Sequence, residues 1–405
     1  MFILKSQRMK APLLAVFLFT SIVLSAQDFK VVGYLANWNF STAPAKIEWE
    51  RLTHVNLAFA NPDANGDLSF EGEEITTVVD SAHANGVEVF VSLAGGYLTP
   101  DWQANWNYWM QPDHTQEFIG KIIAYVQTND LDGVDIDLEW QHVNDLYSPF
   151  VLTLKTALAA EDLPMTAALP GGYRYPQITA PALAAFDWVN LMIYDLTGPW
   201  DPNNPGQHSP YTWAEQCLQY WENQGLPGDR QTLGVPFYGY DFSTTPVDAK
   251  YFGEIVAANP ANAQVDQVGE LYYNGIPTIA AKTQLAQAET SGVMIWELGQ
   301  DAFGEYSEFS LLRAIDEALH PVSGVGEILV ASPLPYPNPA DNYLLVANLP
   351  AGVSEARIVD FQGRTLWVGS LEDGKPISLD GLSSGIYALV MQTNAGLATK
   401  SFIKK

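Results

Sequence analysis

Short apolar runs alternate with longer stretches of helical periodicity along most of the chain. Eight runs have the length and composition of buried strands: 29–35, 52–60, 87–93, 133–139, 164–169, 188–194, 232–238 and 292–296. Helical patterns include 115–129, 148–160, 211–223, 283–289 and 310–319. Alternation of strand and helix is typical of a parallel sheet. Eight such repeats predict an α/β fold, a closed (β/α)8 TIM barrel over residues 27–320, with functional side chains at the carboxyl ends of its strands.

The pattern changes after residue 320. Residues 321–332 contain Pro321, Gly324 and Gly326 and are interpreted as a linker. Short runs of alternating polarity follow within 333–405: 343–347, 355–360, 364–371, 386–392 and 399–403. Short alternating strands separated by turn residues predict a second, small all-β sandwich domain.

The fourth run differs from the others because acids occupy every second position. Residues 132–140 read Asp-Gly-Val-Asp-Ile-Asp-Leu-Glu-Trp. In a strand, Asp135, Asp137 and Glu139 share one face, about 6–7 Å apart along the chain. Three confined carboxylates cannot all ionise at low cost, so at least one is expected to hold a proton near neutral pH. Such a group is suited to general acid catalysis. A solvated edge strand is the alternative, and it suits one or two acids better than three.

Composition narrows the possible partners. The chain has 405 residues, 47% of them hydrophobic, and a formal net charge of −27. This charge argues against nucleic acid and anionic membranes as partners. A neutral polymer such as a polysaccharide is compatible with it, although keeping an exported protein soluble explains the acidity equally well.

The first 26 residues have the pattern of a signal peptide. Lys5, Arg8 and Lys10 precede an apolar run over 13–24, and small residues follow at 25–26. No later run reaches the ~20 apolar residues of a membrane span. Export is therefore expected. The single cysteine, Cys217, precludes an internal disulfide and is expected to be a buried thiol.

The acidic run resembles the signature D-G-x-D-x-D-x-E of glycoside hydrolase family 18, the chitinases and their relatives. Asp132, Gly133, Asp135, Asp137 and Glu139 occupy its fixed positions. The resemblance extends over most of residues 29–320. It implies hydrolysis of β-1,4 bonds in chitin or N-acetylglucosamine oligosaccharides.

Other segments resemble the same family. Residues 192–195 read Met-Ile-Tyr-Asp, matching its M-x-Y-D pattern. The resemblance implies that Tyr194 binds the N-acetyl group of the sugar, that Met192 and Asp195 line the cleft, and that Trp296 forms its floor. A core tryptophan is the alternative for Trp296, but its position at a strand end favours the site. The remaining residues expected at the cleft are Tyr34, Trp38, Gly95, Gly96 and Tyr238.

Two positions depart from the family pattern. The third run ends Leu93-Ala94-Gly95-Gly96 where relatives have S-x-G-G, so a hydrogen bond to the first acids is missing or supplied otherwise, with Ser92 adjacent. Tyr240 stands where relatives often have arginine.

The segment between the seventh and eighth runs is about 50 residues with one helix, which predicts an open groove suited to internal cleavage. Sugar stacking and loop packing are equally good explanations for a further set of tryptophans: Trp102, Trp106 and Trp109.

The resemblance implies a retaining mechanism in which the substrate supplies the nucleophile. Glu139 protonates the glycosidic oxygen, and the N-acetyl carbonyl attacks the anomeric carbon to give an oxazolinium ion. Asp137 orients the acetamide, and Asp135 shares the proton of the row. Two rival functions stay open: an endo-β-N-acetylglucosaminidase acting on N-glycans, and a chitin-binding lectin, which the presence of Glu139 disfavours. The six histidines show no ligand spacing, so neither a metal site nor a cofactor is expected.

The end of the chain resembles a different family. The strings at 336–340 (Tyr-Pro-Asn-Pro-Ala), 360–364, 382–387 and 402–405 are similar to the C-terminal sorting domain of the Bacteroidetes type IX secretion route. This resemblance implies passage through the periplasm to the cell surface or the medium, with the type IX secretion machinery as partner. A carbohydrate-binding sandwich is the alternative, but it has few candidate exposed aromatics, of which Trp367 is the best, so the sorting domain is favoured.

Overall fold

The computed structural model describes residues 29–321, 334–347, 355–360, 364–371, 375–393 and 396–405. The predicted signal peptide and nearly all of the predicted linker lie outside these residues. The chain divides into two compact units, residues 1–320 and 321–405.

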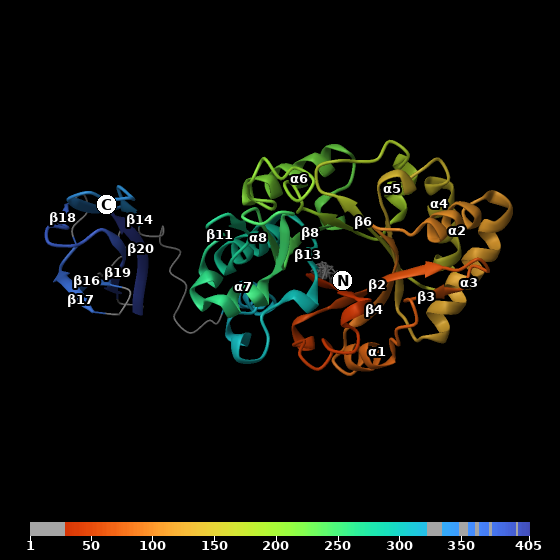
Figure 1. Cartoon of the computed structure of the whole chain (residues 1–405), viewed down its shortest axis with the longest axis horizontal. Helices are drawn as coiled ribbons and strands as arrows, with labels where there is room; N and C mark the ends of the chain where they lie inside the picture. Colours follow the sequence, from red (N-terminus) through yellow and green to blue (C-terminus); the bar gives the residue numbers. More distant parts are fainter. Residues whose placement is uncertain (1–28, 322–333, 348–354, 361–363, 372–374, 394–395) are drawn as a thin grey trace, which may run out of the picture. The chain divides into compact units, whose positions relative to one another are not determined.

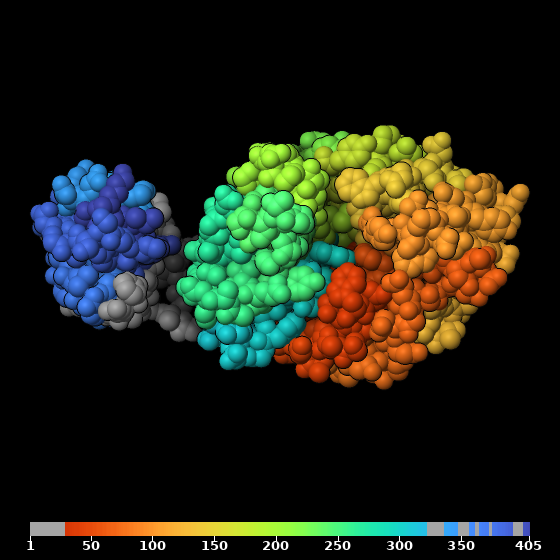
Figure 2. Space-filling model, viewed as in Figure 1, coloured from red at the N-terminus to blue at the C-terminus, as the bar shows by residue number. Residues whose placement is uncertain are grey.

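The first unit is a closed barrel of eight parallel strands (Figure 1). These strands are β1 (Lys30–Ala36), β2 (His54–Pro62), β4 (Glu88–Gly95), β5 (Gly133–Leu138), β6 (Met165–Pro170), β7 (Val189–Met192), β8 (Gln231–Pro236) and β13 (Gly292–Trp296). Their order is β1-β13-β8-β7-β6-β5-β4-β2, and pairing of β1 with β2 closes the ring. Figure 2 shows the first and last parts of this unit, in red and teal, packed side by side. The predicted TIM barrel is confirmed.

Helices surround the strands (Figure 1). They are α1 (Thr76–His83), α2 (Pro100–Trp109), α3 (Pro112–Thr128), α4 (Tyr147–Ala159), α5 (Ala180–Ala185), α6 (Tyr211–Asn223), α8 (Ile276–Glu289) and α9 (Leu311–Leu319). The prediction for α8 began seven residues too late. Gly275 precedes this helix and Pro277 lies in its first turn. Proline is tolerated there because the first amides of a helix lack internal acceptors.

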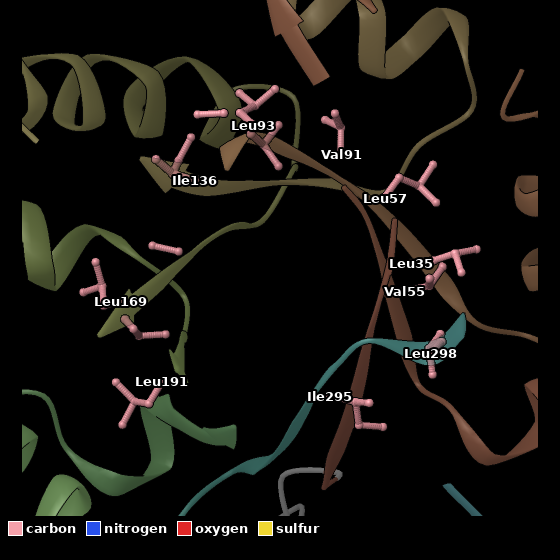
Figure 3. Packing of buried hydrophobic residues seen from close by; sticks show 14 of the residues in the cluster. Leu35, Val55, Leu57, Val91, Leu93, Ile136, Leu169, Leu191, Ile295 and Leu298 are labelled. Atoms are coloured by element: carbon pink, nitrogen blue, oxygen red, sulfur yellow. The ribbon is translucent and has the colours of Figure 1, made fainter. Parts of the chain in front are cut away.

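Side chains alternate between the two sides of the barrel wall, as the period of two requires. Leu57, Val91, Ile136 and Leu169 are fully buried. Figure 3 shows them around the outside of the strands. Full burial of one such side chain contributes about 1.5–3 kcal/mol. The opposite side of the wall carries polar residues, which hydrogen-bond with one another across the interior.

Between β8 and β13 the chain forms an insertion that the sequence prediction missed. A four-stranded antiparallel sheet of order β10-β9-β12-β11 lies there. It comprises β9 (Tyr238–Asp241), β10 (Asp248–Tyr251), β11 (Gln267–Val268) and β12 (Leu271–Tyr272). Helix α7 (Phe252–Ala258) lies between β10 and β11. Strands of two to four residues are too short to show periodicity. Tyr238 therefore belongs to this sheet, whereas the seventh barrel strand was predicted to include it.

The second unit is an all-β sandwich, as predicted. One sheet has the order β14-β15-β18 and the other β17-β16-β19-β20. The strands are β14 (Leu334–Tyr336), β15 (Tyr343–Ala347), β16 (Glu355–Asp360), β17 (Thr365–Gly369), β18 (Ile377–Ser378), β19 (Gly385–Thr393) and β20 (Gly396–Lys404). Leu344 and Ile377 of the first sheet share one buried cluster with Ile358, Leu389 and Phe402 of the second.

Candidate active site

The acidic row runs along the inside of β5 to its carboxyl end. Asp135 and Asp137 are buried, and Glu139 is the first residue beyond the strand. Asp132, the first acid of the signature, lies at the other end, where its carboxylate accepts from the Val89 amide and contacts His83 at 2.8 Å. Asp132 therefore anchors the start of the strand, and the other three acids are the candidates for chemistry.

Asp135 is surrounded by hydrogen-bond donors from four other strands. Its carboxylate accepts from Tyr34 (2.7 Å), Ser92 (2.7 Å), Thr166 (2.6 Å) and Asn190 (3.2 Å). Burial raises the pKa of Asp135, and these four hydrogen bonds oppose that rise. Satisfying a buried carboxylate this way stabilises its charged form.

Ser92 resolves the departure seen in the third run. It pairs with Asp135 in the parallel ladder between β4 and β5, and its hydroxyl supplies the hydrogen bond that was in doubt. The two residues with positive φ here are Ala94 (φ 86°) and Gly95 (φ 90°). Ala94 thus occupies a backbone conformation that glycine adopts more readily.

Asp137 and Glu139 both hold protons more strongly than ordinary carboxyls. Burial, reinforced by the charges of Glu139 and Asp135, raises the pKa of Asp137 well above its usual value. Burial and the nearby charge of Asp195 raise the pKa of Glu139 to about 7. Because these groups interact, they titrate as one set.

The glycines after β4 shape the space beside the acids. A Cβ on Gly96 would lie 2.5 Å from Oε1 of Glu139, so the carboxyl packs directly on this residue. A Cβ on Gly95 would lie 2.5 Å from the Phe59 ring. Phe59 in turn stacks on Trp296, with ring centroids 5.6 Å apart and planes inclined by 17°.

A first cavity of about 370 Å³ opens over the carboxyl ends of the strands. Most of the predicted site residues line it: Tyr34, Trp38, Gly96, Asp137, Glu139, Met192, Tyr194, Asp195 and Trp296. Asp135, Gly95 and Tyr238 are not among its lining residues. The lining also includes Asn61, Glu71, Tyr97 and Trp102. Of the other candidate tryptophans, Trp106 and Trp109 are buried in the main core.

A second cavity, of about 460 Å³, adjoins the first. Its lining includes Trp140, Tyr173, Tyr175, Leu196 and Trp213. The two cavities have four lining residues in common: Glu139, Met192, Tyr194 and Asp195. Sequence reasoning missed this cavity, although aromatic residues directly after β5 and β6 were a signal for it.

Asp195 is held by two tyrosines of the insertion. Its backbone is left-handed (φ 66°), and its Oδ1 accepts hydrogen bonds from the hydroxyls of Tyr238 and Tyr240, the latter at 3.0 Å. Tyr238 therefore does not line the first cavity but orients Asp195, which does. Tyr240, at the position where arginine was expected in relatives, is a site residue that the sequence prediction did not include.

Cys217 is a buried free thiol, and burial raises its pKa to about 12. The described residues contain no group of three or more His, Cys, Asp or Glu side chains placed to hold a metal ion. Within the same residues, no helix is both long and apolar enough to cross a bilayer.

Comparison with known proteins identifies matches for both units. The family model described as glycosyl hydrolases family 18 matches residues 30–301, and that of the secretion system C-terminal sorting domain matches residues 335–405. These matches agree with both resemblances seen in the sequence.

Solved structures of bacterial chitinases are similar to the barrel. One, from the chitin utilization locus of Flavobacterium johnsoniae, is 42% identical, with a TM-score of 0.70 over 73% of this chain and 96% of the other. A chitinase from Bacteroides thetaiotaomicron is 30% identical, with a TM-score of 0.64 over 74% and 99%.

Curated relatives are more distant. A chitinase-like effector of Moniliophthora roreri is 26% identical over 54% of this chain and 60% of its own length. An endochitinase of Manduca sexta is 24% identical over 59% and 50%. This chain therefore spans less than two thirds of the length of these relatives.

Proposed function

Because this chain belongs to the glycosyl hydrolases of family 18, we propose that it is an exported chitinase that cleaves β-1,4 bonds between N-acetylglucosamine units within a polymer. One observation carries this proposal. Glu139, a carboxyl group whose pKa is raised to about 7, lies where two cavities meet. Sugar units bound in the two cavities would place their connecting oxygen beside this acid.

The first step needs a proton on the leaving oxygen. With a pKa near 7, the Glu139 carboxyl is largely protonated in mildly acidic solution and still partly so at neutral pH. A general acid works best when its pKa is close to the working pH. Glu139 would donate its proton to the glycosidic oxygen and then, as a carboxylate, accept one from the incoming water.

The nucleophile in this proposal is the substrate's own N-acetyl carbonyl. Asp137 lines the first cavity beside Glu139. Its carboxyl is therefore the candidate partner of the acetamide N–H and, once ionised, the candidate stabiliser of the positive charge of an oxazolinium ion. Tyr194 lines the same cavity and is the candidate donor to the acetamide oxygen. Two displacements at the anomeric carbon retain its configuration.

Exposed aromatic side chains surround the cavities and support binding of a sugar polymer. Trp38, Tyr97, Trp140 and Tyr173 are each more than half exposed, and each follows a different barrel strand. Aromatic rings offer flat apolar faces on which sugar rings can stack. Because such residues flank Glu139 on both sides, binding sites for sugars on either side of the bond are expected, which favours internal cleavage.

Export is the second part of the proposal. The sorting-domain match over residues 335–405 supports transport by the type IX secretion machinery. The signal-peptide pattern of residues 1–26 supports an earlier passage to the periplasm.

Hydrolysis of chitohexaose and of an N-glycosylated protein tests the substrate assignment. The proposal predicts that the purified protein cleaves internal bonds of chitohexaose. Release of N-glycans without cleavage of chitohexaose would instead identify an endo-β-N-acetylglucosaminidase. Binding of both substrates without turnover of either would identify a lectin.

A further inference from the structure

A buried lysine lies behind the site, on the helix that precedes β13. Lys282 of α8 has no exposed surface, and it forms no ion pair among the described residues. Its ammonium group donates instead to three neutral oxygens: the Ser209 carbonyl (2.6 Å), the Ser209 hydroxyl (2.6 Å) and Asn274 Oδ1 (2.7 Å). Burying an amino group is costly unless its donors are satisfied, and these three oxygens satisfy them. Burial lowers the pKa of Lys282 to about 7.

The Lys282 contacts lead directly to the end of β7. The Ser209 hydroxyl, which accepts from Lys282, donates to the carbonyl oxygen of Ile193. Ile193 immediately precedes Tyr194 and Asp195, which line both cavities. A continuous hydrogen-bonded path therefore runs from α8 to the backbone that carries these two cleft residues.

The neighbouring residue, His208, supports the same segment at a second point. Its ring is fully buried, with Nε2 3.2 Å from the Tyr238 carbonyl oxygen and Nδ1 3.5 Å from the Asp195 amide nitrogen. Its carbonyl accepts from the Leu196 amide at 2.9 Å. Asp195 has a positive φ, which costs a non-glycine residue about 1–2 kcal/mol and persists only where the surroundings hold it.

The insertion between β8 and β13 also bonds to this segment, which comprises Gln207, His208 and Ser209. Gln207 donates to the carbonyl oxygens of Asp266 and Tyr273, at 3.1 and 2.6 Å. Asn274 donates to the Ser209 carbonyl at 3.0 Å. Residues 207–209, termed here the strut, therefore connect the insertion and α8 to the backbone at 193–196.

We propose that Lys282 is a positioning residue, which acts through the strut to fix Tyr194 and Asp195 in the cleft. The proposal rests on the chitinase function proposed above. Lys282 lines neither cavity, so we expect its effect on turnover to pass through the strut to the backbone at 193–196. A small displacement of a catalytic group is enough to slow the reaction, because reacting atoms must be closely aligned.

A double-mutant cycle separates positioning from general stability. Ser209→Ala and Lys282→Met should each lower kcat/KM for chitohexaose about tenfold, mainly through kcat. In a background that impairs both positioned groups, Tyr194→Phe combined with Asp195→Asn, the same changes should cost less than about twofold. The control is Thr283→Val, whose hydroxyl bonds only to Ile279 within the same helix; it should leave kcat/KM within about twofold of the wild type. Full tenfold losses in the Tyr194→Phe, Asp195→Asn background would overturn the proposal.

Hydrogen exchange tests the same idea without turnover. In Lys282→Met and Ser209→Ala, the amides of 193–196 should exchange faster than in the wild type, while the amides of β5 should exchange at the wild-type rate. In the Thr283→Val control, both sets of amides should exchange at the wild-type rate. Unchanged exchange at 193–196 would contradict a positioning role. If the wild type does not cleave chitohexaose, the chitinase function fails, and exchange at 193–196 alone decides whether Lys282 supports this backbone.

Discussion

The Glu139 carboxyl packs directly on Gly96, since a Cβ at Gly96 would lie 2.5 Å from its Oε1. Gly96→Ala should therefore displace the acid while leaving the barrel folded. We expect kcat on chitohexaose to fall by about 10²-fold, because catalysis depends on close alignment of the acid. Circular dichroism of the variant should match that of the wild type.

Gly120→Ala is a suitable control for this change. Gly120 lies within α3, and an added Cβ would meet nothing within 4 Å. Alanine should raise the free energy of unfolding by about 1 kcal/mol and leave kcat unaltered. A Gly96→Ala enzyme with wild-type kcat would show that the acid tolerates displacement, contrary to the proposed mechanism.

The pH profile should report the proton on Glu139. Since the acid must be protonated, activity is expected to fall as pH rises through about 7. Asp195→Asn removes a negative charge that raises the pKa of Glu139, so the alkaline limb of kcat should move to lower pH. The control is Asp80→Asn, which removes the charge of an exposed aspartate on helix α1 and should leave the alkaline limb where it is in the wild type. An alkaline limb that stays in place in Asp195→Asn would argue against this electrostatic coupling.

The donors around Asp135 give a prediction for the acidic limb of the pH profile, which should move to higher pH when one donor is removed. Ser92→Ala removes one hydrogen bond to this carboxylate, which should raise its pKa and move the acidic limb of the profile to higher pH. We expect a loss of about tenfold in kcat, which is about 1.4 kcal/mol and corresponds to the lower end of the range for a hydrogen bond to a charged group. Ser81→Ala, which loses an exposed hydroxyl bonded to Thr77, is the matched control. The expectation fails if both serine variants behave alike.

Buried acids should make folding stability depend on pH. Burial raises the pKa of Asp301 to about 6, although its carboxylate accepts from Ser310 and from amides at the start of α9. Burial likewise raises the pKa of Glu297 to about 7. A raised folded-state pKa adds stability that is full below the unfolded value and is lost as pH rises through the folded value.

Urea unfolding followed by tryptophan fluorescence would measure this effect. The free energy of unfolding should decrease between pH 5 and pH 8, with Asp301 contributing on the order of 1–2 kcal/mol. Asp301→Asn should show a weaker dependence on pH. A free energy that increases over this range would exclude the buried acids as the dominant titrating groups.

Local patterns in the sequence were sufficient to predict the barrel and its acidic row. The period-two spacing of Asp135, Asp137 and Glu139 is a strong signal because each side of a barrel wall has one environment. The short strands of the insertion gave no such signal. The contact between Lys282 and Ser209 joins residues 73 positions apart, and only the folded chain brings them together.

The same distinction applies within the site. Residues at strand ends, such as Tyr194 and Trp296, could be placed in the cleft from their position in the repeat. Tyr240 could not, because its hydroxyl reaches Asp195 from a sheet that the sequence pattern did not reveal. The donors to Asp135 come from four separate strands, and their convergence follows from closure of the barrel.

The most direct test of the central claim is to follow the anomers released from chitohexaose by NMR, for the wild type and for Glu139→Gln. The account predicts that the wild type first releases β-anomers, and that Glu139→Gln retains the fold but loses at least about 10³-fold in kcat. Initial release of α-anomers, or turnover in Glu139→Gln close to that of the wild type, would contradict it.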